Sequence, residues 1–246
     1  METRLRQSGV TLTEMTVVVG VVALLVAFGL PAVRTLFDSL ASSGGARAMI
    51  SATLASARAM AAKEHEYVGV RFQNRYSKDG KAGQYMVFII HDFDKTELAN
   101  GFRAVEGVEP IKLPDALGVM EVIEHKLGDS AIDDANEVTD KTTFSIVFSS
   151  SGKLVIHDVQ TRNRGGEATA TSSEDDIFNV ESNVKNGIGM FVQDDDPDKE
   201  PSRNRFKIYD KTVFEKVDKN KRWSDYLEDL DFIYINPYTG RMISAD

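Results

Sequence analysis

Glu14 stands out because it lies at the edge of a long apolar segment. Residues 15–33, directly after it, contain no charged side chain. A carboxylate inserted into an apolar helix costs roughly 2.5–3.5 kcal/mol, and less where it stays hydrated at the helix N-terminus. Two interpretations are open. Glu14 stays hydrated, or it pairs with a free α-amine, which cleavage just before Val10 would create on a neighbouring subunit.

The other titratable residues show no catalytic pattern. The four histidines, His65, His91, His125 and His157, are spread singly, which favours surface or hydrogen-bonded roles. There is no pair of histidines with metalloprotease spacing, no nucleophile elbow, no phosphate loop and no dinucleotide fingerprint. The absence of cysteine excludes disulfides, thiolate zinc sites and iron–sulfur clusters. We therefore expect no catalytic residue, no metal, no cofactor and no enzymatic activity.

Two acidic runs offer the hard oxygen ligands that calcium prefers, Asp92-x-Asp94 and residues 194–198. Neither run has the spacing of an EF-hand, so we predict solvated acidic loops, with calcium binding as the alternative. The 246-residue chain has a formal charge of −9 and a pI near 5.1. No nucleic-acid partner is expected from this charge, because binding to phosphates requires a basic surface.

The apolar segment predicts a membrane span. At about 1.5 Å per residue, the 19 to 24 residues between positions 10 and 33 form a helix of roughly 30–36 Å, close to the hydrocarbon thickness of a bilayer. The alternatives are a buried core helix and a secretory signal peptide. Arg4 and Arg6 precede the segment, which favours a cytoplasmic N-terminus. We expect a single-pass membrane protein in which everything after about residue 35 is exported.

Residues 9–15, Gly-Val-Thr-Leu-Thr-Glu-Met, together with the apolar segment resemble the prepilin processing signal of type IV pilins and type II secretion pseudopilins. The resemblance implies that prepilin peptidase cuts after Gly9 and N-methylates Val10. It also implies that Glu14 takes part in assembly and that Pro31 kinks the helix. The implied partners are other pilin or pseudopilin subunits, the peptidase, an inner-membrane assembly platform and the lipid bilayer. The implied location is the inner membrane, with a single span and a periplasmic C-terminal domain, free or within a periplasmic or surface filament.

Two later segments resemble minor pseudopilins of the GspH type. One is residues 56–62 followed by a strand at 67–72, and the other is the turn at 148–154. The implied fold is α+β: a long N-terminal helix, membrane-spanning in its first half, packed on a C-terminal antiparallel β-sheet domain. The predicted divisions are a leader at 1–9, a transmembrane helix at 10–35, the outer half of the helix at 36–65, and a β-rich domain at 66–246.

The periodicity of the sequence locates these elements. Ile50, Leu54, Ala57 and Ala61 recur at helical spacing and predict a stripe that packs on the sheet. Residues 161–186 are polar and predict a long loop, and a short helix is predicted at 223–230. Short β-branched or aromatic runs predict eight strands, at 67–72, 84–92, 119–125, 143–148, 153–158, 188–193, 206–209 and 232–236.

The family resemblance implies a structural subunit, most similar to a minor pseudopilin, of a type II secretion or type IV pilus-like filament. Its mechanism would be assembly through the N-terminal helix after peptidase processing. The alternative is a membrane-anchored periplasmic binding protein or enzyme whose N-terminal anchor is not cleaved. Secretion, a surface pilus and DNA uptake are all compatible with the sequence.

Overall fold

The computed structural model describes residues 15, 17–19, 21, 43–78, 83–121, 142–168, 172–196 and 201–244. Its named helices are α2 (Ser43–Glu64), α3 (Phe93–Thr96), α5 (Glu181–Lys185), α6 (Lys211–Lys216), the 3₁₀-helix η1 (Lys219–Lys221) and the π-helical turn η2 (Trp223–Leu227). The strands are β1 (Val68–Asn74), β2 (Gln84–His91), β3 (Gly101–Ala104), β4 (Ile111–Lys112), β5 (Leu117–Met120), β6 (Phe144–Phe148), β7 (Leu154–Val155), β8 (Gln160–Thr161), β9 (Phe178–Asn179), β10 (Phe191–Val192), β11 (Arg205–Asp210), β12 (Ile233–Ile235) and β13 (Met242–Ser244).

A seven-stranded sheet organises the domain. Its strand order is β7-β6-β1-β2-β3-β8, with β4 paired to β2. β1 lies at the centre and pairs antiparallel with both β2 and β6, whereas β3 and β8 are parallel. A second sheet has the order β13-β12-β11-β5, and β9 and β10 form a short parallel pair. The described domain is therefore predominantly β and of mixed strand direction.

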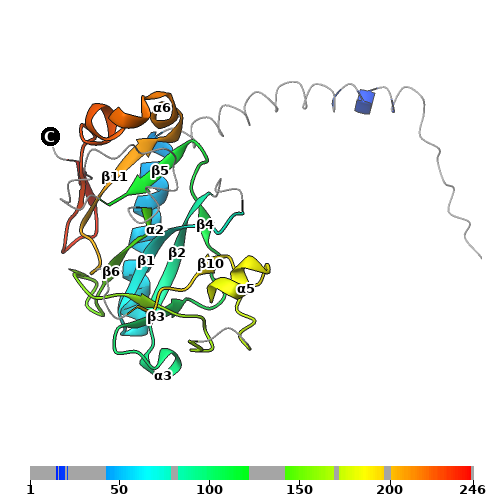
Figure 1. Cartoon of the computed structure of the whole chain (residues 1–246), viewed down its shortest axis with the longest axis vertical. Helices are drawn as coiled ribbons and strands as arrows, with labels where there is room; N and C mark the ends of the chain where they lie inside the picture. The colour runs from blue at the N-terminus through cyan, green and yellow to red at the C-terminus, as the bar shows by residue number, and fades with distance from the viewer. Residues whose placement is uncertain are drawn as a thin grey trace, which may run out of the picture.

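Helix α2 covers one face of the large sheet (Figure 1). Its predicted stripe is confirmed, because Ile50, Leu54, Ala57 and Ala61 are fully buried. They recur every three or four residues, so they share one side of the helix. They belong to the same apolar cluster as alternate residues of the sheet and as residues of the second sheet, among them Val68, Val70, Phe72, Phe148, Phe206 and Ile233.

The opposite face is closed by residues 156–196, which we call the cover segment. The structure describes this segment except for residues 169–171. The apolar side chains on that face of the sheet include Val87, Ile89, Phe102 and Val147. They cluster with four buried residues of the cover segment: Val159, Ile177, Phe178 and Phe191. Both faces of the large sheet are thus buried, and the domain has three layers.

A buried amide joins the two sheets. The side chain of Gln84, at the start of β2, donates to the carbonyl of Val119 at 2.7 Å and accepts from the Val119 amide at 2.7 Å. It also donates to the carbonyl of Thr142. A primary amide side chain reproduces the donor and acceptor of a peptide group, so Gln84 takes the place of a neighbouring strand beside β5.

The predicted fold class is wrong. Among the described residues, α2 is the longest helix, at 22 residues, and no long apolar N-terminal helix is found. α2 begins at Ser43 and carries Arg47, Arg58, Lys63 and Glu64, so it is amphipathic and suited to the surface of a sheet. The domain is mainly β-sheet with short helices, and its strands are not all antiparallel.

The predicted localisation is also contradicted. In the part of the chain that the structure describes, no helix combines the length and the apolar character needed to cross a bilayer. The single-pass inner-membrane topology, with its transmembrane helix, is not supported by this finding. Within the predicted span at 10–35, the structure describes only Met15, residues 17–19 and Val21, and the other positions lie outside it.

The strand predictions are largely confirmed in position. β1, β2, β6, β11 and β12 lie within one or two residues of the expected ranges. The predicted strand at 119–125 begins earlier, as β5, and residues 122–125 lie outside the described part. The sequence patterns do not predict β3, β4, β8, β9 and β13. The predicted long loop at 161–186 contains β9 and the whole of α5, and η2 confirms the short helix predicted near Trp223.

Truncation of the helix stripe should unfold the domain readily. We expect Leu54→Ala to lower the free energy of unfolding by about 2–5 kcal/mol, because it removes a fully buried side chain and leaves a cavity. Ser56→Ala, on the exposed side of the same helix, should change it by no more than about 0.5 kcal/mol. Urea denaturation measures both. Equal effects of the two substitutions would contradict the assignment of the buried face.

Candidate functional site

The residues that the sequence places at the processing and assembly site lie outside the described part of the chain. These are Gly9, Val10, Glu14 and Pro31. Their predicted roles in cleavage, N-methylation, assembly and helix kinking stay predictions. Of the apolar segment after Glu14, the described residues Met15, 17–19 and Val21 are helical and between 51% and 64% exposed.

The acidic run at 194–196 is a structural part of the cover segment. Asp194 forms an isolated antiparallel bridge with Thr161, in which each backbone N–H donates to the other residue's carbonyl, at 2.6 and 2.9 Å. Its carboxylate pairs with Arg71 at 2.9 Å, and that of Asp195 pairs with Arg162 at 3.2 Å. The prediction of a solvated acidic loop is therefore wrong for these two residues, because arginines hold both carboxylates.

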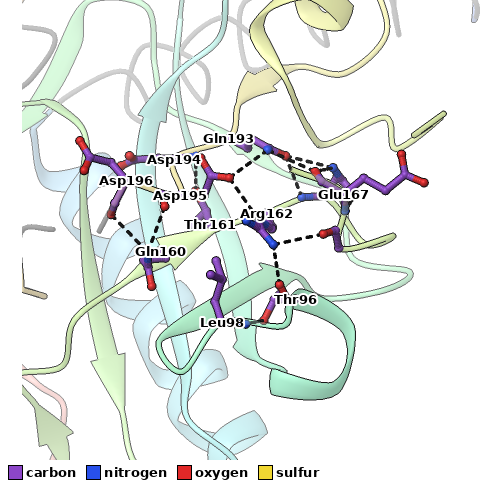
Figure 2. A network of polar contacts seen from close by, with 12 residues as sticks. Thr96, Leu98, Gln160, Thr161, Arg162, Glu167, Gln193, Asp194, Asp195 and Asp196 are labelled. Atoms are coloured by element: carbon purple, nitrogen blue, oxygen red, sulfur yellow. Dashed lines mark hydrogen bonds and ion pairs between the residues drawn. The ribbon is translucent and has the colours of Figure 1, made fainter. Parts of the chain in front are cut away.

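Arg162 is the centre of this network (Figure 2). Besides Asp195, its guanidinium donates to the carbonyl of Thr96 at 2.8 Å, at the end of α3, and to that of Gly166 at 3.3 Å. Nearby, the amide of Gln160 donates to the carbonyls of Asp195 and Asp196. The planar guanidinium supplies several donors in fixed directions, so one side chain fixes α3, the acidic run and the turn at 164–167 together.

Arg71 performs a similar role from within the sheet. It lies in β1 with its side chain only 4% exposed, on the face that the cover segment closes. Its Nε donates to Gln73, and the Gln73 amide donates to the carbonyl of Val192 in β10. A buried arginine requires such partners, because an unpaired buried charge is very costly. Arg71 and Gln73 thus attach β10 and Asp194 to the central strand.

Asp92 joins the end of β2 to α3. Its carboxylate caps α3 by accepting from the Lys95 amide at 3.0 Å, and it pairs with Arg103 at 2.6 Å. Burial favours the neutral carboxyl, but the hydrogen bonds from Arg103 and Lys95 outweigh it and lower the pKa of Asp92. Like Asp194, Asp92 is engaged by an arginine rather than forming part of a solvated acidic loop.

Two of the singly spread histidines come together. His91 and His157 have ring centroids 6.0 Å apart, and both rings contact Tyr67 and Phe102. The His91 ring also hydrogen-bonds the carbonyl of Ala99, and the His157 ring that of Asp158. Both rings are therefore hydrogen-bonded, which is one of the two roles predicted for the histidines. His65 lies at the exposed end of α2 with a positive φ, and His125 lies outside the described residues.

The sequence patterns assign no role to Arg58, but in the structure this residue attaches α2 to two turns. Its guanidinium donates to the carbonyls of Gly152 at 2.7 Å, Tyr238 at 3.0 Å and Thr239 at 3.1 Å. Gly152 has φ +71°, a conformation that favours glycine. The two segments that resemble minor pseudopilins, at 56–62 and 148–154, therefore meet at this contact. The sequence signal that could have indicated this contact is an arginine on the polar side of a predicted helix.

The described residues contain no group of three or more histidine, aspartate or glutamate side chains arranged to hold a metal ion. The carboxylates of Asp92, Asp194 and Asp195 are instead bound by arginines. Such arginine–carboxylate pairs fix backbone segments relative to one another. These pairs therefore hold α3 and the acidic run at 194–195 against neighbouring segments.

No protein-family model, curated protein or solved structure matches this chain.

The Asp92 pair should contribute stability that depends on pH. Because folding lowers the pKa of Asp92 below its ordinary value of 3.8, the pair stabilises the fold above that value. This contribution is lost as the pH falls through the folded-state pKa. Asp92→Asn keeps an acceptor for the α3 cap and should lower the free energy of unfolding at pH 7 by about 1 kcal/mol or more.

Urea denaturation from pH 7 to pH 3 measures this difference, which should shrink as the solution is acidified. Asp94→Asn, at an exposed position of α3 with no ion pair to the described residues, is the matched control and should show a much smaller effect. A difference between wild type and Asp92→Asn that stays constant over the whole range would contradict the charge pair.

Removal of the Arg162 guanidinium should loosen the cover segment. We expect Arg162→Met to lower the free energy of unfolding by about 1–3 kcal/mol, because three acceptors lose a charged donor while the apolar part of the side chain is kept. The control is Arg241→Met, at an exposed position whose guanidinium has no partner among the described residues. Equal urea midpoints for both variants would contradict the role of Arg162.

Proposed function

We propose that this chain is a structural subunit, of the minor pseudopilin type, of a secretion or pilus-like filament. It is processed after Gly9 by a prepilin peptidase and assembles with other pilin-type subunits through its N-terminal segment. The observation that carries this proposal is the register of Gly9, Val10 and Glu14 immediately before the uncharged residues 15–33. Cleavage at that position would give each subunit an α-amine four residues from an isolated carboxylate.

The order of elements in the described domain supports the same proposal. α2 leads directly into the central strand β1 and is held against the sheet by its buried stripe and by Arg58. A subunit that transmits force between its N-terminal segment and its globular domain needs a firm attachment at that point. The three carbonyl acceptors of Arg58 provide one, because they come from two separate turns.

An exposed apolar surface on the second sheet supports assembly. Tyr234 in β12 and Ile243 in β13 are directly opposite in the strand register, and both are exposed, at 37% and 49%. Tyr238, in the connecting turn, is 68% exposed. Aromatic side chains are enriched in protein interfaces. This surface is suited to contact with a neighbouring subunit, and the short strand β13 at its edge limits unspecific strand pairing.

Processing is tested on protein purified from its native host. Intact-mass measurement and N-terminal sequencing should give a mature chain that begins at Val10, with or without one added methyl group. Gly9→Val should block cleavage, because a side chain at that position obstructs entry of the backbone into a tight peptidase site. Ser8→Ala is the matched control and should be cleaved normally. A wild-type chain that retains Met1 to Gly9 would refute the proposal.

Assembly is tested separately at Glu14. We expect Glu14→Ala to reduce the subunit's content in the isolated filament fraction by about tenfold or more, because loss of a desolvated charge pair costs about 2–5 kcal/mol. Thr13→Ala should leave that content unchanged. Quantitative immunoblotting of the filament fraction against total subunit gives the measurement. An undiminished content of Glu14→Ala would rule out the Glu14–amine pair.

A further inference from the structure

A hollow of about 430 Å³ lies between the end of β1 and the end of α5. Arg75, Tyr76 and Lys78 come after β1 and form one side, while Lys185 and Asn186 form the other. Ligand pockets commonly measure about 300–1,000 Å³, so the hollow has room for a small molecule. None of its lining residues belongs to the Arg162 network.

The charge around this hollow is opposite to that of the whole protein. Three cationic side chains, Arg75, Lys78 and Lys185, line it in a chain of net charge −9. Lys185 is paired with Glu181 at 2.7 Å. The Arg75 guanidinium and the Lys78 ammonium have no hydrogen-bond or ion-pair partner among the described residues, although most arginines that the structure describes are engaged. The side chains of two cationic residues that line the hollow are therefore unengaged by any other described residue.

The walls of the hollow are fixed by backbone hydrogen bonds. On one side, the Arg75 amide donates to Gly83 and the Tyr76 amide donates to Met190. On the other side, the amides of Gly187 and Ile188 donate back to α5, to the carbonyls of Val184 and Asn183. Gly189 has φ +95°, and a Cβ there would lie 2.8 Å from the Cβ of Asn179, so only glycine fits this turn. The protein's own hydrogen bonds therefore hold the backbone around the hollow.

From this geometry we propose that the hollow binds a small phosphate ester. The Arg75 guanidinium offers paired donors that match a phosphate, and Lys78 and Lys185 add charge around it. The ring of Tyr76 gives an apolar wall for the sugar or other organic part of the ligand, and the Asn186 amide gives a neutral donor and acceptor. A soluble sugar phosphate and an anionic lipid headgroup share this chemistry.

Binding is tested with the full chain by isothermal titration calorimetry, using glucose 6-phosphate at 0.15 M salt. We expect saturable binding, weakened about tenfold or more in the double variant Arg75→Gln/Lys78→Gln, because that variant loses charge-assisted hydrogen bonds. Arg241→Gln removes one exposed arginine elsewhere, unengaged among the described residues, and should bind as wild type. Binding should also weaken as salt is raised, since the cations are exposed.

A second arm distinguishes the source of the phosphate. Flotation with vesicles of phosphatidylcholine containing phosphatidylglycerol reports headgroup binding, and pure phosphatidylcholine vesicles are the control. The site is supported if wild type binds in either arm, the double variant loses that binding, and Arg241→Gln keeps it. The proposal is overturned if wild type binds neither probe, if the double variant binds as wild type, or if Arg241→Gln is weakened equally. None of these outcomes depends on processing at Gly9.

Discussion

The central strands of the large sheet are buried on both faces, and both faces must be covered. The β1 residues that face the cover segment, Arg71 and Gln73, are polar. In β1, six consecutive residues from Val68 to Gln73 are buried. One side of that strand packs on α2, and the other packs under the cover segment. Because burial of apolar area is the main favourable term in folding, the positions of α2, the second sheet and the cover segment all result from this requirement.

Arginines fix each of the two covers to the sheet. Arg58 attaches α2 through three carbonyls, while Arg71 and Arg162 attach the cover segment through Asp194, Asp195 and the carbonyl of Thr96. Exposed ion pairs contribute little to stability. These arginines are half-buried or buried, and each has several acceptors, so they contribute more and also fix direction. Arginines likewise engage the carboxylates of Asp92, Asp194 and Asp195 in the two acidic runs.

Helical periodicity and β-branched runs are sufficient to locate α2 and the main strands. Ile50, Leu54, Ala57 and Ala61 can be predicted as one buried face because their spacing alone determines it. The cover segment cannot be predicted in this way, because its buried polar residues look like loop residues. Asn163, Asn179 and Thr161 are all fully buried, and their side chains or backbone groups hydrogen-bond within the domain.

The candidate sites, too, include features that local sequence spacing cannot predict. Pairing of His91 with His157, and the hollow between Arg75 and Lys185, depend on strand order and on the path of the cover segment, neither of which is encoded by local spacing. Composition and family resemblance predict a long apolar N-terminal helix. In the described part, the longest helix is instead amphipathic and begins at Ser43. The role of residues 9–14 in processing and assembly stays a prediction, because these residues lie outside the described part.

Native-state hydrogen exchange on the wild-type chain tests the central claim most directly, namely that the cover segment is an integral layer of one cooperative domain. The amides of Phe191, Gln193 and Asp194, which donate to Ile177, Asn179 and Thr161, should exchange with the same free energy and denaturant dependence as the amides of β1 and β2. Exchange of these three amides through an opening of several kcal/mol lower free energy, with β1 and β2 still protected, would contradict it.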